Sequence, residues 1–237
     1  MHRSIKHYLT LGAILTGICS MGQTGLAATV EPGLKITLHV SNYAHVESET
    51  LDRAKQEATR IFREIGVETL WLDQSLLPKE DQQDSAPHRI SEIYLNIVPR
   101  AADGLGVLNN SLGLAPGAGR GRGRLYVFYD RVEGLYHKQI AATARGKIPR
   151  SATTAQILGY AMAHEIGHLL GLDAHSSVGI MRAEWRMDDV LNLAYGDLAF
   201  TPRQAAVIRG EVRMRQQANL GVAEPQGLNL SLHRGRR

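Results

Sequence analysis

The sequence predicts an α+β (α/β-like) domain in which helices pack on a mixed, twisted sheet. Two observations predict this class. Short segments that alternate apolar and polar residues, or that are rich in β-branched and aromatic residues, are typical of strands and lie before residue 130. Helical periodicity follows the first of these segments, and helix-initiation motifs recur in the second half of the chain. Strands that alternate with a helix in the first half of the chain, followed by helices in the second half, indicate a layered domain around one core.

The first elements expected are a strand, a helix and a second strand. Residues 34–40 (LKITLHV) alternate apolar and polar side chains, which indicates a strand with one buried face. A helix should follow, with Ser48 as a possible N-cap and Gly66 at its end. Its apolar residues recur at helical spacing: Leu51, Ala54, Ala58, Ile61 and Ile65. Residues 67–72 (VETLWL) then predict the second strand.

The middle of the chain should complete the sheet. Residues 73–88 are charged and contain two prolines, which predicts a surface loop before a third strand at residues 92–98 (EIYLNIV). Residues 104–111 (GLGVLNNS) are interpreted as a short edge strand, and residues 125–129 (LYVFY) as a further strand. The segment 113–124 (GLAPGAGRGRGR) has no G-K-[ST] motif and no interleaved aromatic residues, so a surface loop is favoured over a phosphate or nucleic-acid contact.

Two capping boxes predict helices in the second half. Thr153 and Gln156 (T-x-x-Q) should open a helix that is apolar nearly all round and is therefore expected to be buried. Thr201 and Gln204 form a second box, with Pro202 at the first helical position. This second box predicts a C-terminal helix.

The N-terminus has the pattern of a secretory signal peptide over residues 1–28. Arg3 and Lys6 precede a short apolar run, and small residues collect where cleavage would occur, near Ala27 or Ala28. The apolar run is too short to cross a bilayer comfortably. We therefore expect a secreted or periplasmic protein, without stable membrane insertion after cleavage. A single folded domain should follow, and residues 224–237 should form a flexible C-terminal tail.

The single cysteine and the small net charge limit the kinds of site to expect. Cys19 is the only cysteine, and cleavage removes it, so the mature chain would have neither a disulfide nor a thiolate metal ligand. Cleavage also removes Arg3 and Lys6 and lowers the formal net charge from +4 to +2. That small excess gives no reason to expect a nucleic-acid partner.

His164, Glu165 and His168 form the motif H-E-x-x-H on the expected buried helix. Residues four apart lie one turn apart on one face, so two imidazoles can bind one ion. Glu165 lies about 100° around the axis, where it would face a zinc-bound water and not the ion. Zinc with three protein ligands keeps one position for that water, and Glu165 is the predicted general base. Gly171 can adopt a positive φ and turn the chain back toward the site.

The third ligand is displaced by one residue. The long motif H-E-x-x-H-x-x-G-x-x-H would place a histidine at position 174, where Ala174 has no donor atom. Asp173 could bind through oxygen but comes one residue early, and His175 comes one residue late. A loop can absorb an extra residue, and imidazole matches the other two ligands, so His175 is the predicted third ligand and Asp173 the alternative.

The stretch from His164 to Met181 resembles the metzincin metallopeptidases, whose long motif is followed by a methionine-containing turn (the Met-turn) beneath the metal. HEIGHLLGLD is similar to the matrixin-like branch, and Gly179-Ile180-Met181 matches the Met-turn. The extra residue before His175 departs from that pattern, so the nearest likeness is to uncharacterised bacterial metzincin-like proteins with a lengthened third-ligand spacing. The resemblance implies a metzincin-like catalytic domain over residues 29–223, with an active-site helix and a C-terminal helix. Outside residues 164–181 it is architectural only.

The resemblance also implies a function. It indicates a secreted zinc-dependent endopeptidase, with Zn²⁺ as cofactor and a polypeptide substrate that lies along the edge strand, expected near residues 104–111. Trp185 should lie in the core or on the wall of the substrate cleft. Two alternatives stay open, because the third ligand is shifted and the same site suits other amides. One is a zinc-binding module without turnover, and the other is a hydrolase of a non-protein amide such as a cell-wall peptide. The sequence sets neither the cleavage preference nor the oligomeric state.

Overall fold

The computed structural model describes residues 33–74, 92–102, 111–116 and 123–222. The expected signal peptide, residues 1–28, and the expected tail, residues 224–237, lie outside these ranges, so both stay predictions. Within the described ranges, no helix has the length and apolar character needed to cross a bilayer.

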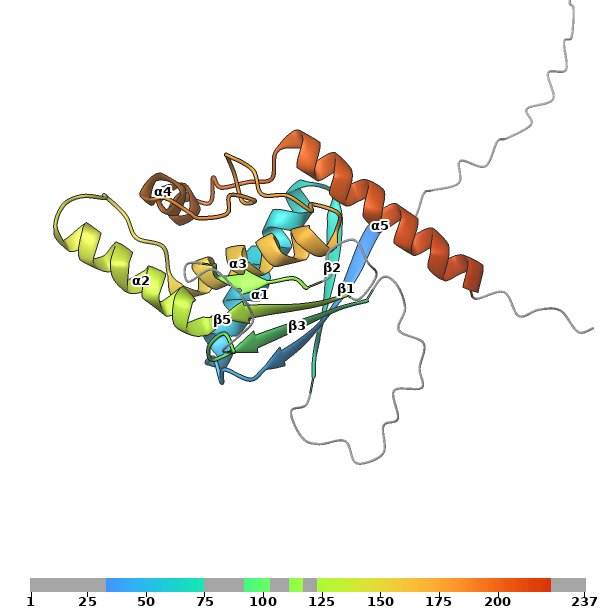
Figure 1. The fold of residues 1–237 in the computed structure, drawn as a ribbon, viewed down its shortest axis with the longest axis horizontal. Coiled ribbons are helices and arrows are strands. Elements are labelled where there is room, and N and C mark those ends of the chain that lie inside the picture. The colour runs from blue at the N-terminus through green and yellow to red at the C-terminus, as the bar shows by residue number, and fades with distance from the viewer. Residues whose placement is uncertain (1–32, 75–91, 103–110, 117–122, 223–237) are drawn as a thin grey trace, which may run out of the picture. The chain divides into compact units, whose positions relative to one another are not determined.

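Five strands form one mixed sheet (Figure 1). They are β1 (Leu34–Asn42), β2 (Val67–Asp73), β3 (Glu92–Val98), β4 (Gly113–Leu114) and β5 (Arg124–Phe128). Their order is β2-β1-β3-β5-β4, and every neighbouring pair is parallel except β4 and β5. The α+β class with a mixed sheet is therefore confirmed.

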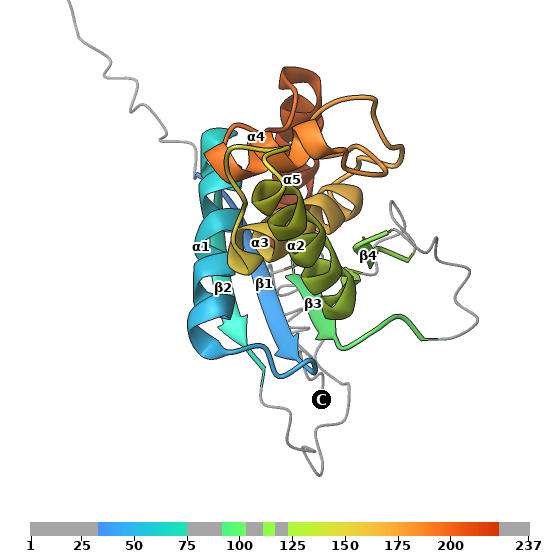
Figure 2. The ribbon, with the colours of Figure 1, turned by 90° about the vertical axis from the view of Figure 1, so that its left-hand side faces the viewer.

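Five helices accompany the sheet. They are α1 (Ser48–Glu64), α2 (Tyr129–Ala144), α3 (Thr154–Leu169), α4 (Met187–Tyr195) and α5 (Pro202–Val222). Helix α1 joins the parallel strands β1 and β2, which need such a crossover. Figure 2 shows α1 and α3 in front of the strands, and the residues of β1 that alternate into the core are Ile36, Leu38 and Val40. The helices α1 and α3 thus pack on one face of the sheet.

Helix α3 begins where its capping box predicts. The Gln156 amide donates to Thr153 Oγ1 at 3.1 Å, and the Thr153 amide donates to Gln156 Oε1 at 3.0 Å. Thirteen of its sixteen residues are buried, as the apolar sequence predicts. The second box is also present, since the Thr201 amide donates to Gln204 Oε1 at 2.9 Å at the start of α5. Both the buried helix that carries the H-E-x-x-H motif and the C-terminal helix are therefore confirmed.

Several expected boundaries were wrong. Ser48 is the first residue of α1 and Glu47 is its N-cap, without a side-chain cap. Tyr129 opens helix α2 and does not end a strand. Helices α2 and α4 had no sequence-based prediction, and α2 shows the reason. It buries only Val132, Gln139 and Ala142, so its apolar periodicity is weak.

The edge strand also lies elsewhere. Of the expected range 104–111, residues 104–110 fall outside the described residues and Ser111 is not in a strand. Strand β4 is instead Gly113–Leu114, within the segment expected to be a surface loop, and it pairs antiparallel with β5. A glycine at its start permits a close approach to the neighbouring backbone.

The crossing of α1 and α3 depends on a glycine. A Cβ at Gly159 would lie 2.6 Å from the Ala54 carbonyl oxygen and 2.8 Å from Glu57 Cβ. Gly159→Ala should therefore lower the free energy of unfolding by about 2 kcal/mol, because the clash outweighs the better helix propensity of alanine. The matched control is Gly210→Ala in α5, where a Cβ meets open space, and it should be neutral or stabilising. Urea unfolding compares the two, and a shift of both variants in the same direction would contradict the close crossing.

Candidate metal centre

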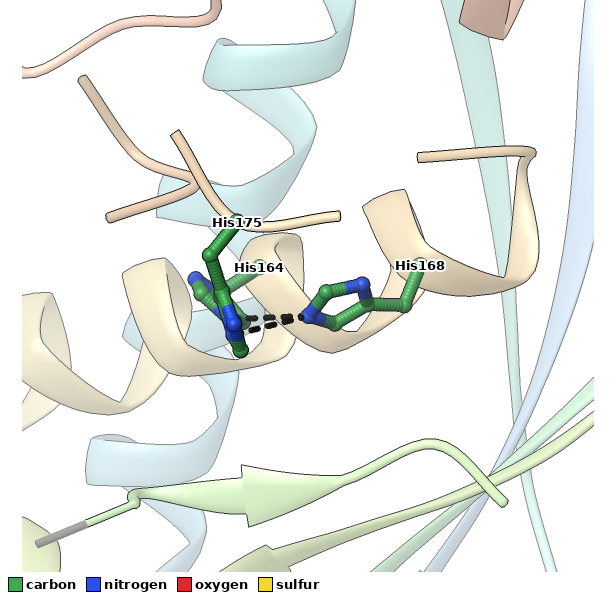
Figure 3. Close-up of side chains that lie close together, drawn as sticks. All are labelled: His164, His168 and His175. Atoms are coloured by element: carbon green, nitrogen blue, oxygen red, sulfur yellow. Dashed lines mark hydrogen bonds between the residues drawn. The ribbon is translucent and has the colours of Figure 1, made fainter. Parts of the chain in front are cut away.

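Three imidazoles converge beside α3. His164 and His168 lie one turn apart on that helix, with their Nε2 atoms 3.1 Å apart, and His175 Nε2 lies 3.3 Å from His168 Nε2. Figure 3 shows the three rings pointing toward one another, His175 from the segment that follows the helix. One nitrogen from each falls within 4.8 Å of the others, which is the geometry of a candidate metal site. Within the described part of the chain, this is the single cluster of its kind.

Backbone carbonyls orient two of the rings. His164 Nδ1 lies 2.8 Å from the Ile180 carbonyl oxygen, and His168 Nδ1 lies 2.6 Å from the Leu172 carbonyl oxygen. A carbonyl can only accept, so each Nδ1 carries the hydrogen and each Nε2 presents a lone pair to the other rings. Lone pairs that face each other this closely repel unless a cation lies between them. Orientation of this kind is typical of histidines that bind metals.

The protonation states agree with metal binding. Burial, and after it the neighbouring His168, lower the pKa of His164 to about 3. Burial also lowers the pKa of His168. Both imidazoles are thus neutral at neutral pH, which is the form that binds a metal ion.

The donor set fits zinc. Four-coordinate zinc takes imidazole nitrogens at 2.0–2.1 Å, which separates two such nitrogens by about 3.3 Å. The separations of 3.1 and 3.3 Å in the structure match that spacing. His164, His168 and His175 would hold the ion and leave a fourth position open.

The loop after α3 brings the displaced histidine to the site. Leu170 ends the helix, and Gly171 follows with φ of 90°, the positive value that its position in the motif predicts. The Leu172 amide then donates back to the Gly167 carbonyl at 3.1 Å. The turn is thus tight as far as Leu172. The extra residue that displaces His175 from position 174 falls after that hydrogen bond, between Leu172 and His175. His175 is exposed, and the exposed Asp173 is not part of the three-residue cluster.

Met181 packs against α3. It is fully buried, and a Cβ at Gly167 would lie only 2.9 Å from its sulfur. The turn that carries it begins at Gly179, with φ of 72°, and its chain returns to Ser176, whose amide donates to the Met181 carbonyl at 2.8 Å. The same turn supplies the Ile180 carbonyl that orients His164.

Glu165 lies next to the imidazoles but is not part of the cluster. Its side chain is 4% exposed, and burial raises its pKa from 4.5 to about 8. Strand β4 passes directly over it, because a Cβ at Gly113 would lie 2.6 Å from Glu165 Cγ. Sequence reasoning missed this contact, since no local pattern links the two residues.

A cavity of about 420 Å³ opens beside His164 and Glu165. Trp185 forms part of its wall and also packs against the core, as the sequence led us to expect of its core position. Its Nε1 donates to the Ile180 carbonyl at 3.1 Å, and its ring meets that of His164 edge-on with centroids 6.3 Å apart. The residues that α2 contributes to this wall were not foreseen, because that helix was not predicted.

The close contact of β4 gives a testable prediction. Gly113→Ala would place a Cβ 2.6 Å from Glu165 Cγ and 2.5 Å from the Tyr126 carbonyl oxygen, so Glu165 or the strand must move. We expect kcat for any hydrolysis by the zinc-loaded protein to fall by about tenfold to a hundredfold, with zinc content unchanged, because an ångström-scale shift of a carboxylate beside the metal site has effects of that order. Gly210→Ala serves as the control, because this glycine does not line the cavity and a Cβ there meets open space. An unchanged kcat would show that Glu165 does not need this spacing.

The metal-free protein should have a pH-dependent stability that reports on Glu165. Because the pKa of Glu165 is raised to about 8 in the folded state, its contribution to stability is complete below pH 4.5 and is lost as pH rises to about 8. Glu165→Gln removes that dependence, so at pH 8 the variant should be more stable than the wild type by on the order of 3 kcal/mol. The lowered pKa of His164 acts in the opposite direction, with stability lost as pH falls below 6.5, and it is common to both proteins. Urea unfolding of both proteins, in the presence of a chelator and from pH 4.5 to pH 8, tests the prediction. The same dependence of stability on pH in wild type and Glu165→Gln would contradict it.

Comparison with known proteins adds little to this geometry. No family model matches the sequence, and no curated protein matches it. Among solved structures, the chain is similar to an archaemetzincin from Methanopyrus kandleri, at 15% identity and a TM-score of 0.47, over 78% of this chain and 99% of that one. A likeness this distant says nothing of activity, so the chemistry of the site rests on its own residues.

Proposed function

We propose that the protein is a zinc-dependent metallopeptidase of metzincin type that cleaves peptide bonds within polypeptides. One observation carries the proposal, namely three imidazole nitrogens that converge on a single point with a buried carboxylate beside them on a cavity wall. The placement of Met181 beneath the helix turn between His164 and His168 adds support, because it agrees with the metzincin-like sequence pattern.

The residues of the chain suit hydrolysis. Bound Zn²⁺ supplies a Lewis acid that polarises a carbonyl and lowers the pKa of water to about 7. Glu165 takes a proton from the attacking water and returns it to the leaving nitrogen, and a pKa raised by burial suits both transfers. Hydrogen bonds to the Ile180 and Leu172 carbonyls fix the rings of His164 and His168. Strand β4 offers a sheet edge close to Glu165, along which an extended peptide can add.

The test uses the purified chain loaded with zinc. Denatured casein and a pool of quenched peptides should be cleaved, and a chelator should stop the reaction. A cell-wall peptide in a parallel assay separates polypeptide cleavage from hydrolysis of a non-protein amide. Zinc bound at about one ion per chain with no hydrolysis in any of these assays would contradict the proposal and favour a binding module without turnover.

We further propose that the protein is secreted or periplasmic. The basic start, short apolar run and small residues of the segment 1–28 support this location. The N-terminal sequence of the exported chain should begin near residue 28 or 29. An unprocessed N-terminus on protein that stays inside the cell would contradict it.

A further inference from the structure

The cavity beside Glu165 has a distinctive charged wall. Helix α2 supplies one side through Arg131, Gly134, Leu135 and Lys138. These positions are spaced three and four residues apart, so they share one helix face. The face is thus neutral at its centre and carries a cation at each end.

The opposite side comes from the segment after Met181. Arg182, Glu184, Trp185 and Arg186 line the cavity there, and Asp130 lines it at the start of α2. Apart from Glu165, the described residues of the wall therefore carry four cations against two carboxylates. Its cationic residues are Arg131, Lys138, Arg182 and Arg186.

Two of the four cations are already engaged. Arg182 Nε lies 3.0 Å from Asp189 Oδ2, a buried carboxylate that is not part of the wall. Arg131 donates to the Ser111 carbonyl and lies over the Phe128 ring, 4.7 Å from its centroid. Lys138 and Arg186 are exposed and form no ion pair with any residue that the structure describes. Their charges can therefore meet a ligand.

The centre of the wall has room for that ligand. A Cβ built at Gly134 meets no atom within 4 Å, so the glycine widens the cavity and does not serve a close helix contact. Apolar surface from Leu135 and Trp185 continues beside it. An apolar stem with an anionic end matches this combination.

We propose that this cavity selects peptide substrates that place a carboxylate in it, held by Lys138 and Arg186. The inference rests on the proposed peptidase function and names the substrate class of the same site. The carboxylate can be that of a glutamate or aspartate side chain within the chain, or the free C-terminus of the peptide. The two sources share this chemistry and differ in whether cleavage is internal or terminal.

Binding is measured on zinc-loaded, full-length Glu165→Gln, which holds peptide without cleaving it. Trp71→Phe in the same chain leaves Trp185 as the sole tryptophan, so intrinsic fluorescence reports on the cavity wall. The probes are capped Ala-Ala-Glu-Ala-Ala and the same peptide with glutamine or lysine in place of glutamate. Tri-alanine with a free or an amidated C-terminus forms the second arm.

We expect the carboxylate peptide in at least one arm to bind about fivefold more tightly than its uncharged partner, and salt to reduce the difference. Lys138→Gln should remove most of this preference. Lys147→Gln, an exposed lysine outside the cavity, should keep it. Gly134→Leu should fill the cavity and weaken binding of every peptide, while zinc content stays the same.

Equal affinities for the charged and uncharged peptides in both arms, tighter binding of the lysine peptide, or no binding at all would overturn the inference. Cleavage of peptides by wild-type protein without any carboxylate preference would overturn it alone and leave the peptidase proposal standing. Carboxylate-selective binding that depends on Lys138, combined with no hydrolysis by wild-type protein, would overturn the peptidase proposal and leave the binding site.

Discussion

Glu165→Gln should lower kcat for peptide hydrolysis by about a thousandfold while the protein keeps about one zinc ion per chain. Glutamine has nearly the same shape as glutamate but cannot accept and return a proton, and general-base catalysis is worth roughly 10²–10⁴-fold. The metal should stay, because the candidate ligands are three histidines and Glu165 is not part of their cluster. Assays with a quenched peptide and metal analysis of the same sample measure the two quantities.

The control for this variant is Glu133→Gln, an exposed carboxylate that is not among the residues lining the cavity. It removes one negative charge away from the cavity wall, so kcat should change by less than about threefold. If Glu165→Gln retained most of the wild-type kcat, a different group would have to move the proton. If it lost zinc as well, its role would be structural.

The second large effect concerns the third ligand. His175→Ala should weaken zinc binding by more than about a hundredfold, since loss of a residue that only supports a ligand already costs 10–100-fold. Asp173→Ala should leave zinc affinity close to that of wild type, because its carboxylate is not part of the cluster. Competition with a chromophoric chelator measures both affinities.

Thermal unfolding provides an independent measure of the same ligand. Zinc that binds only the folded protein should stabilise the wild type by about 4 kcal/mol when its free concentration is a thousand times Kd, and at the same zinc concentration the stabilisation of His175→Ala should fall below about 1.4 kcal/mol. His168→Ala gives the reference for loss of a ligand on the helix itself. If Asp173→Ala lost the ion and His175→Ala kept it, the assignment of His175 would be wrong.

Much of the fold follows from local patterns. The positions predicted for β1, β2 and β3 agree with the structure within two residues. For β1 the pattern is alternation, because a half-buried strand needs an apolar side chain at every second position. The capping boxes located the starts of α3 and α5, because the hydrogen bonds involved join residues only three apart. Helix α2 escaped prediction because it buries few side chains along its length. Strand β4 escaped because two residues carry no periodicity.

Part of the candidate site also follows from local patterns, and part depends on tertiary packing. Spacing alone placed His164 and His168 one turn apart with Glu165 beside them, because a helix has a fixed number of residues per turn. The positive φ at Gly171 was also foreseeable, since glycine adopts it without a steric penalty. Whether a ring that arrives one residue late could reach the other two was open on sequence grounds, because the path of a loop depends on what it packs against.

The sequence alone thus accounts for the class of fold, the buried helix and the three residues on it that can do chemistry, because each depends on neighbours within a turn or along one strand. Four features follow instead from packing between distant segments. They are the approach of His175 to His168, the contact of the Ile180 carbonyl with His164, the close passage of Gly113 over Glu165, and the cations that α2 contributes to the cavity wall. Such contacts depend on how side chains from separate elements share space and exclude water, which no local pattern in the chain encodes.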